Sequence, residues 1–212
     1  MTRAGSLVAG LAVMLVACAA RPPALSVAPS ASAFFPAPDL GHGKVLAEGC
    51  MACHSAEALA SDPGTVNAAR LLHQRRSAIF RALQDYRSGR RQSPFMQPVA
   101  AALSDQDMRD VAAAIAGPMY EVPPRPHTEM PIYPRTQRNC AMCHGETGIG
   151  ELEGMPVLAG QSPGYLAKAL AEYRSGARRE PTMRAIAKGI APADDAALAG
   201  YYAAHTWLEG SR

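Results

Sequence analysis

Apolar residues recur at helical spacing in several short stretches of this chain, and glycine, proline and polar residues separate these stretches. The clearest stretch runs from Ser162 and Pro163, which suit a helix start, to Gly176, which suits a helix end. The apolar positions between them fall on one face and are Leu166, Ala169, Leu170 and Tyr173. The pattern predicts a chain built from short amphipathic helices.

Other stretches follow the same pattern. Ser104 and Asp107 form a capping pair ahead of an apolar face made of Met108, Val111, Ala112 and Ile115. A helix ending at Gly89 presents Ile79, Leu83 and Tyr86, and a helix starting at Pro192 presents Leu198, Tyr201 and Tyr202. Near the start of the folded chain, Lys44, Val45 and Leu46 lead on one helix towards Cys50.

The two halves of the chain repeat one another. Tyr-Arg-Ser-Gly begins at Tyr86 and again at Tyr173, and a methionine follows ten positions after each tyrosine, at Met96 and Met183. Both methionines are expected in a non-helical context. The repeat predicts two domains, residues 39–117 and 134–212, joined by a stiff proline-rich linker over residues 118–133.

The first residues are typical of a bacterial export signal, residues 1–17. Arg3 precedes an uncharged run of 11 residues, which is too short for a permanent membrane span. The run ends in Leu-Val-Ala-Cys at Cys18, which resembles a lipobox and predicts lipidation of Cys18. The alternative is cleavage after Ala19, which would remove Cys18. Residues 18–38 are rich in Ala, Pro and Ser and are expected to form an extended tether.

Composition sets limits on size and partners. The chain has 212 residues, 48% of them apolar, which suffices for one ordinary domain or two small ones. Domains of fewer than about 80 residues are expected to need a cofactor to complete their cores. The formal net charge of +3 is too modest to indicate nucleic-acid binding.

The strongest chemical signal is Cys-x-x-Cys-His, which occurs at Cys50-Met51-Ala52-Cys53-His54 and at Cys140-Ala141-Met142-Cys143-His144. Two thiols on one helical turn can add to the vinyl groups of a haem, and the adjoining histidine can then ligate the iron. Four such thiols could instead form a zinc site. A histidine directly after each pair favours two covalently bound haems c over zinc.

Met96 and Met183 are the candidate sixth ligands, because they occupy matching positions in the two repeats. His73 is a rival to Met96, whereas His42, His127 and His205 are expected to be exposed. Two arginine pairs are also expected to be solvated or near haem propionates, with partner docking as a lesser alternative, and they are Arg90-Arg91 and Arg178-Arg179.

These residues resemble the class I cytochromes c, and among them the two-haem cytochrome c4 family, over nearly all of residues 39–212. The likeness is strongest in the second half, in Cys140 to Gly145, Pro156 to Gln161, the Tyr-Arg-Ser-Gly turn and Met183. It implies an all-α fold of two tandem cytochrome c domains, with ligation of the second haem by His144 and Met183. It also implies that the carbonyl of Pro156 holds the outer nitrogen of His144.

The first half departs from this pattern. Aligning Met96 on Met183 places Ala69 at the position of Pro156 and His73 at that of Gly160, although Leu71 and Gln74 match Leu158 and Gln161. The sequence therefore leaves open which group orients His54 at the first haem.

A haem with both His and Met ligands has no open coordination position, which favours electron transfer over catalysis. The resemblance implies passage of electrons from a quinol-oxidising complex to a haem-copper terminal oxidase in the bacterial periplasm. Two alternatives stay open: a dedicated haem subunit of a periplasmic dehydrogenase or reductase complex, and a two-haem peroxidase.

Overall fold

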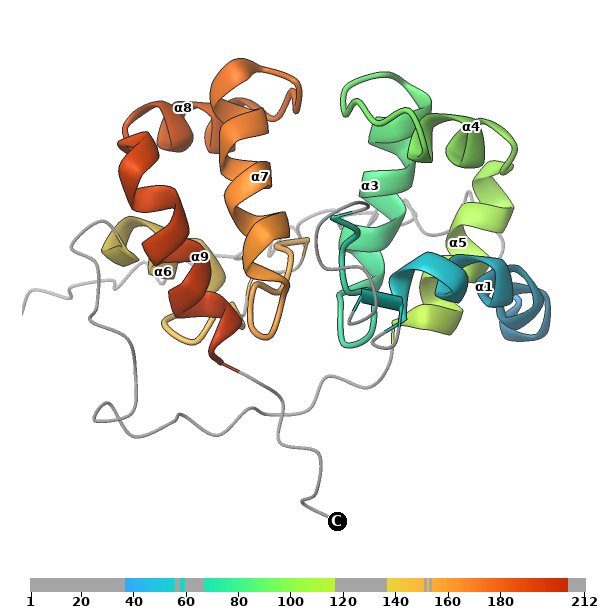
Figure 1. Cartoon of the computed structure of the whole chain (residues 1–212). Coiled ribbons are helices and arrows are strands. Elements are labelled where there is room, and N and C mark those ends of the chain that lie inside the picture. Colours follow the sequence, from blue (N-terminus) through green and yellow to red (C-terminus); the bar gives the residue numbers. More distant parts are fainter. Residues whose placement is uncertain are drawn as a thin grey trace, which may run out of the picture. The chain divides into compact units, whose positions relative to one another are not determined.

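The computed structural model describes residues 37–55, 58–59, 67–116, 137–150, 152 and 154–205. In these ranges the regular structure is helical, apart from an isolated antiparallel bridge between Arg91 and Arg178. The first half contains α1 (Leu40–His54), α3 (Arg76–Arg87), α4 (Met96–Ala101) and α5 (Asp105–Ile115). The second contains α6 (Gln137–His144), α7 (Pro163–Ser175), α8 (Pro181–Lys188), a 3-10 turn η3 (Pro192–Asp194) and α9 (Asp195–Ala203) (Figure 1).

In the first half, α1 packs against α5. Asp39 caps α1 by accepting hydrogen bonds from the N–H groups of Gly41 and His42. The predicted capping box of Ser104 and Asp107 starts α5. The core that these helices enclose together with α3 contains Ile79, Leu83, Ala100, Met108, Val111, Ala112 and Ile115.

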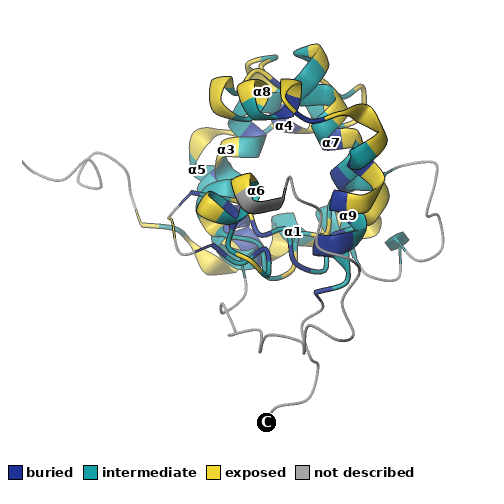
Figure 2. Cartoon of the chain, turned by 90° about the vertical axis from the view of Figure 1, so that its left-hand side faces the viewer, coloured by how far each residue is buried: buried dark blue, intermediate teal, exposed yellow. Residues whose placement is uncertain are grey.

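In the second half, α7 packs against α8 and α9. Ser162 caps α7, and Gly176 ends it with a φ of 88°, a left-handed conformation that glycine adopts without steric cost. Arg174 on α7 donates two hydrogen bonds, of 2.7 and 3.0 Å, to the carboxylate of Asp195 on α9. Buried residues gather on α9 (Figure 2), and they include Leu198, Ala199, Tyr201 and Tyr202.

The predicted helices are therefore confirmed, but two expectations are wrong. Met96 begins α4 and Met183 lies in the first turn of α8, so neither is in a non-helical context. His205 is only 4% exposed, because its ring packs on Tyr201 and its Nδ1 lies 3.0 Å from the Tyr201 carbonyl oxygen.

Some expectations fall outside the described residues. These are the signal at residues 1–17, Cys18, most of the tether, the linker at residues 118–133 and His127. Among the residues that the structure describes, no helix is both long enough and apolar enough to cross a bilayer.

A network of hydrogen bonds connects the start of α1 to α5. Asp110, 1% exposed, accepts hydrogen bonds from the Asp39 N–H at 2.8 Å, the Gln106 amide at 2.7 Å and His42 Nδ1 at 3.0 Å. Burial would raise the pKa of Asp110, but these hydrogen bonds outweigh it and leave the pKa below its ordinary value. The hydrogen bond to Asp110 is the main reason that the pKa of His42 is raised, and Asp107 and Asp39 add to it.

This network predicts a stability optimum in mildly acidic solution. Because the pKa of His42 is raised in the folded state, its contribution is complete below the unfolded pKa of about 6.5 and is lost as pH rises through the folded pKa. Because that of Asp110 is lowered, its contribution is present above about pH 4 and is lost in stronger acid. Thermal unfolding followed between pH 5 and 8 should show a falling Tm above about pH 6.5. The His42→Gln variant should show a flatter profile over the same range, and an unchanged profile would contradict the prediction.

Candidate haem sites

The second Cys-x-x-Cys-His motif forms α6 and brings a buried histidine against a neighbouring loop. His144 is 5% exposed, and its Nδ1 lies 3.0 Å from the carbonyl oxygen of Pro156. A carbonyl only accepts, so Nδ1 carries the proton and Nε2 is left as the nitrogen that can ligate a metal. Burial lowers the pKa of His144, which keeps the ring neutral as a ligand requires.

The first motif ends α1 and makes the same contact in spite of the sequence departure. His54 Nδ1 lies 2.7 Å from the carbonyl oxygen of Ala69, the residue aligned with Pro156. Burial is again the main cause that lowers the pKa of the histidine. The contact survives because it uses a backbone carbonyl, which any residue provides. The turn that follows is also retained, since φ is 63° at His73 and 64° at Gly160.

The two candidate methionine ligands are held in matching ways at their backbones. The N–H of Met96 donates to the hydroxyl of Ser93 at 3.2 Å, and the N–H of Met183 donates to the carboxylate of Glu180 at 2.6 Å. Ser93 and Glu180 occupy equivalent repeat positions, three residues before each methionine. Each methionine thus lies in the first turn of a helix, and a side chain three residues earlier accepts from its N–H.

The residues around the second motif leave room for a bound group. A cavity of about 380 Å³ lies between α6 and α8 and is lined by Asn139, Met142, Ala185, Ile186, Gly189 and Ile190. Met142 lies between the two cysteines of α6, and Ile186 is three residues beyond Met183 on α8. None of the four motif cysteines forms a disulfide. Neutral imidazoles with free Nε2 atoms, adjacent thiols and an apolar cavity fit a covalently attached haem.

Comparison with known proteins identifies this arrangement. The family model for cytochrome c matches residues 41–116 and 135–201. The chain belongs to the cytochrome c family. It is 34% identical to a thiosulfate dehydrogenase electron acceptor from Stutzerimonas stutzeri over 77% of this chain and 82% of that protein.

Two solved structures share the fold. One is the reduced cytochrome c4 from Pseudomonas stutzeri, with a TM-score of 0.60, 26% identity, and coverage of 79% of this chain and 98% of that one. The other is a thiosulfate dehydrogenase from Marichromatium purpuratum, with a TM-score of 0.62, 25% identity, and coverage of 82% of this chain and 42% of that one. The predicted likeness to two-haem cytochrome c4 is confirmed. The cytochrome binds two covalent haems c and is an electron carrier, not itself an enzyme.

The haems supply the one-electron exchange between ferrous and ferric iron. The chain supplies orientation. Peptide carbonyls fix the rings of His54 and His144 through Nδ1, and the first turns of α4 and α8 place Met96 and Met183. Of these four side chains His144 is buried and the others are half-buried.

The arginine pairs of the cytochrome do not all lie in solvent. Arg91 and Arg178 form the antiparallel bridge between the two repeats, supported by hydrogen bonds from Gln92 N to Ala177 O and from Arg179 N to Arg90 O. Arg178 is 7% exposed and its Nε donates to Glu172 at 2.6 Å. Arg90 and Arg179 are exposed, as expected. Arg178 is therefore not solvated, and a place near a haem propionate stays a prediction for the two arginines that pair across the repeats.

Tyr165 is the phenol at the centre of this contact. Its hydroxyl accepts a hydrogen bond from Arg91 at 2.5 Å, and the Arg178 guanidinium lies 5.2 Å from its ring centre. Burial alone would raise the pKa of Tyr165, but the two guanidiniums lower it to about 8. Arg91 Nε is buried with no partner among the described residues, and such a donor suits the carboxylate of a haem propionate.

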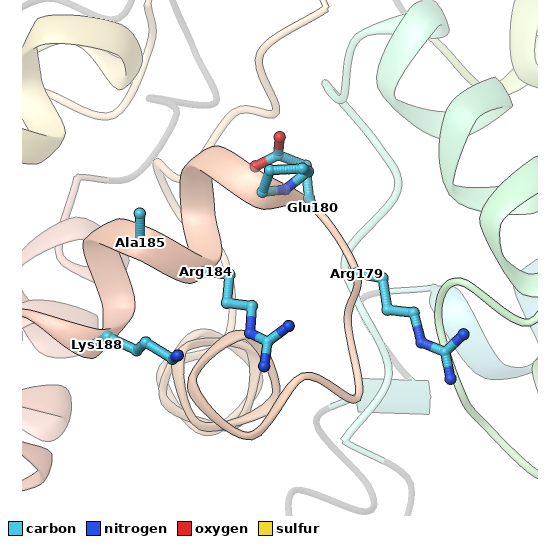
Figure 3. A pocket seen from close by; sticks show the side chains of 6 residues that line it. Arg179, Glu180, Arg184, Ala185 and Lys188 are labelled. Carbon is cyan, nitrogen blue, oxygen red and sulfur yellow. The ribbon is translucent and has the colours of Figure 1, made fainter.

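The exposed face of α8 is cationic. Arg184 and Lys188, one turn apart, project from α8 beside Arg179, and together with Glu180, Pro181 and Ala185 they line a hollow of about 540 Å³ (Figure 3). The carboxylate of Glu180 is engaged in capping its own helix. The equivalent face of the first half, on α4, carries no charge and exposes Phe95 and Val99. The two halves therefore present different surfaces next to their candidate methionine ligands.

Proposed function

We propose that this cytochrome accepts electrons from a periplasmic dehydrogenase that oxidises thiosulfate, and passes them on towards a terminal oxidase. The observation that carries the proposal is the 34% identity, over 77% of the chain, to a protein described as a thiosulfate dehydrogenase electron acceptor. The fold shared with a chain of a thiosulfate dehydrogenase supports it. Of the alternatives that the sequence left open, we therefore prefer a periplasmic dehydrogenase as the electron donor.

We propose specific roles for the site residues. Cys50 and Cys53 attach the first haem, and His54 and Met96 ligate its iron. Cys140 and Cys143 attach the second haem, with His144 and Met183 as its ligands and Pro156 orienting His144. The paired hydrogen bonds of the two histidines and the similar backbone hydrogen bonds of the two methionines support this assignment.

A second candidate function is transfer of electrons from a quinol-oxidising complex to a haem-copper oxidase. The fold shared with cytochrome c4, which the chain matches over 98% of that protein, favours it. The two functions differ in the electron donor, so the donor is what the experiment should identify.

The test mixes the oxidised holoprotein with purified thiosulfate dehydrogenase and thiosulfate, and separately with a purified quinol-oxidising complex and quinol. Reduction is followed at the haem absorption bands in rapid mixing. Fast reduction by the dehydrogenase with slow reduction by the quinol-oxidising complex is the expected result. The reverse order of rates would contradict the proposal and favour the second candidate.

The cationic face of α8 supports docking of an acidic redox partner on the second half. Reversing one charge, Arg184→Glu, should lower the second-order rate constant of reduction roughly tenfold at low ionic strength, because charged surfaces steer association. The difference should shrink as salt screens the charges. Lys44→Glu on exposed α1 is the matched control and should leave the rate nearly unchanged. Equal effects of the two substitutions would contradict docking at α8.

We place the protein in the bacterial periplasm, where haem-carrying Cys-x-x-Cys-His proteins with an export signal function. An export signal at residues 1–17 and lipidation at Cys18 would tether it to a membrane through residues 18–38. Mass spectrometry of the mature N-terminus distinguishes an acylated Cys18 from cleavage beyond it.

A further inference from the structure

Two glutamines at equivalent repeat positions each hold a peptide of the other repeat. The side chain of Gln74 accepts from the N–H of Val157 at 2.7 Å and donates to the carbonyl of Val157 at 3.0 Å. The side chain of Gln161 accepts from the N–H of Arg70 at 2.8 Å and donates to the carbonyl of Arg70 at 3.1 Å. Val157 and Arg70 are themselves equivalent positions, so the contact is reciprocal.

The peptides that the glutamines hold are the ones that orient the two histidines. The N–H of Val157 and the carbonyl of Pro156 belong to one peptide group, and that carbonyl accepts from His144 Nδ1 at 3.0 Å. Likewise the N–H of Arg70 shares a peptide group with the carbonyl of Ala69, which accepts from His54 Nδ1 at 2.7 Å. Each histidine is therefore two hydrogen bonds away from a glutamine of the other repeat.

At this contact Gln74 is half-buried and Gln161 is buried. Gln161 is only 5% exposed, and Val157 is 4% exposed. Each amide oxygen also accepts from the N–H of its own following residue, Arg75 at 3.2 Å and Ser162 at 3.1 Å. Hydrogen bonds in series polarise one another, an effect of about 10–30% per bond in a medium of low dielectric constant. An amide whose N–H donates to a good acceptor is thereby a stronger acceptor at its carbonyl.

We propose that Gln74 and Gln161 are positioning residues that act across the contact between the repeats. Each one tunes the reduction potential of the haem in the other repeat. Gln74 acts on the second haem through the Pro156–Val157 peptide and His144. Gln161 acts on the first haem through the Ala69–Arg70 peptide and His54. The proposal rests on the ligand roles of His54 and His144 proposed above, and adds to them a coupling between the repeats.

The direction of the effect follows from the chain of bonds. A stronger carbonyl acceptor draws the Nδ1 proton and increases electron density on the ring, which stabilises ferric iron. Removing the glutamine weakens that acceptor, so the ferrous form is favoured and the potential rises. The expected change is roughly two- to fivefold in the ferrous-to-ferric equilibrium constant. A tenfold change would correspond to 59 mV for a one-electron couple.

The experiment uses the holoprotein and the near-isosteric variants Gln74→Met and Gln161→Met. Redox titration followed by the NMR resonances of the haem methyl groups gives a separate potential for each haem. Gln74→Met should raise the potential of the haem attached at Cys140 and Cys143, and Gln161→Met that of the haem attached at Cys50 and Cys53. The Nδ1 proton resonance of the affected histidine should shift in the same variant.

Controls separate tuning from a loosened contact between the repeats. Tyr165→Phe removes the hydrogen bond from Arg91 but touches neither peptide, and should not reproduce the crossed pattern. A change confined to the haem of the substituted repeat, or equal changes at both haems, would overturn the proposal. Absence of axial histidine signals at either haem of the wild-type protein would instead overturn the ligand assignment.

Discussion

Replacing Gly43 with alanine is expected to lower the free energy of unfolding of the first half by about 3 kcal/mol. A Cβ at Gly43 would lie 2.2 Å from the carbonyl oxygen of Asp110 and 3.0 Å from Ala114 Cβ. The first of these atoms belongs to the backbone of α5 and cannot turn aside, so α1 would have to move away from α5. The same helix carries Cys50, Cys53 and His54.

Gly49 provides the matched control within α1. It is exposed, and an added Cβ there meets no atom within 4 Å. Gly49→Ala should therefore raise the free energy of unfolding by about 0.5–1 kcal/mol, because alanine is the better helix former. Denaturant titration of the holoproteins, followed by the absorbance of the first haem, measures both effects. Similar midpoints for the two variants would show that α1 does not pack on α5 as closely as described.

Replacing Met183 with alanine is expected to lower the potential of the second haem by on the order of 100 mV, and Met96→Ala to do the same to the first. Thioether sulfur is a soft ligand that favours ferrous iron, so its loss stabilises the ferric form. Each substitution should also abolish the weak sulfur-to-iron charge-transfer band of one oxidised haem. The other haem should be nearly unchanged.

Met142→Ala is the control for these substitutions, because Met142 is 80% exposed on α6 and is expected to make no bond to iron. Because Met142 is not the sixth ligand, both charge-transfer bands should remain in this variant. If Met96→Ala kept both bands, Met96 would not be a ligand. A first haem with two histidine ligands in the wild-type protein would point to His73, the rival at the turn after Ala69.

The local features of this cytochrome could be predicted from its sequence because their causes are local. Ser104 with Asp107, and Ser162 with Gly176, define helix ends through contacts within a few residues. The Cys-x-x-Cys-His motifs place thiols and imidazole on one helical turn, so haem attachment could be predicted without knowing the fold. Met108 was recognisable as core by its position on an amphipathic face, and it is 0% exposed.

Other features depended on which segments meet in three dimensions. His205 was expected to be exposed, but it is buried against Tyr201. Arg91 and Arg178 were expected in solvent or near a haem propionate, and the pairing of the two across the repeats beside Tyr165 was not expected. Whether such side chains are buried depends on residues that are distant in the sequence, so a local sequence pattern does not predict their burial.

The histidine contacts show the same division most clearly. Sequence could identify His54 and His144, but the substitution of Ala69 for the expected proline left the partner of His54 open. The tertiary structure decided it, because the acceptor is a backbone carbonyl and its position depends on the path of the chain, not on the side chain. The hydrogen bonds of Gln74 and Gln161 to the opposite repeat could not be predicted for the same reason. Only the approach of the two repeats brings the Gln74 amide to Val157 and the Gln161 amide to Arg70.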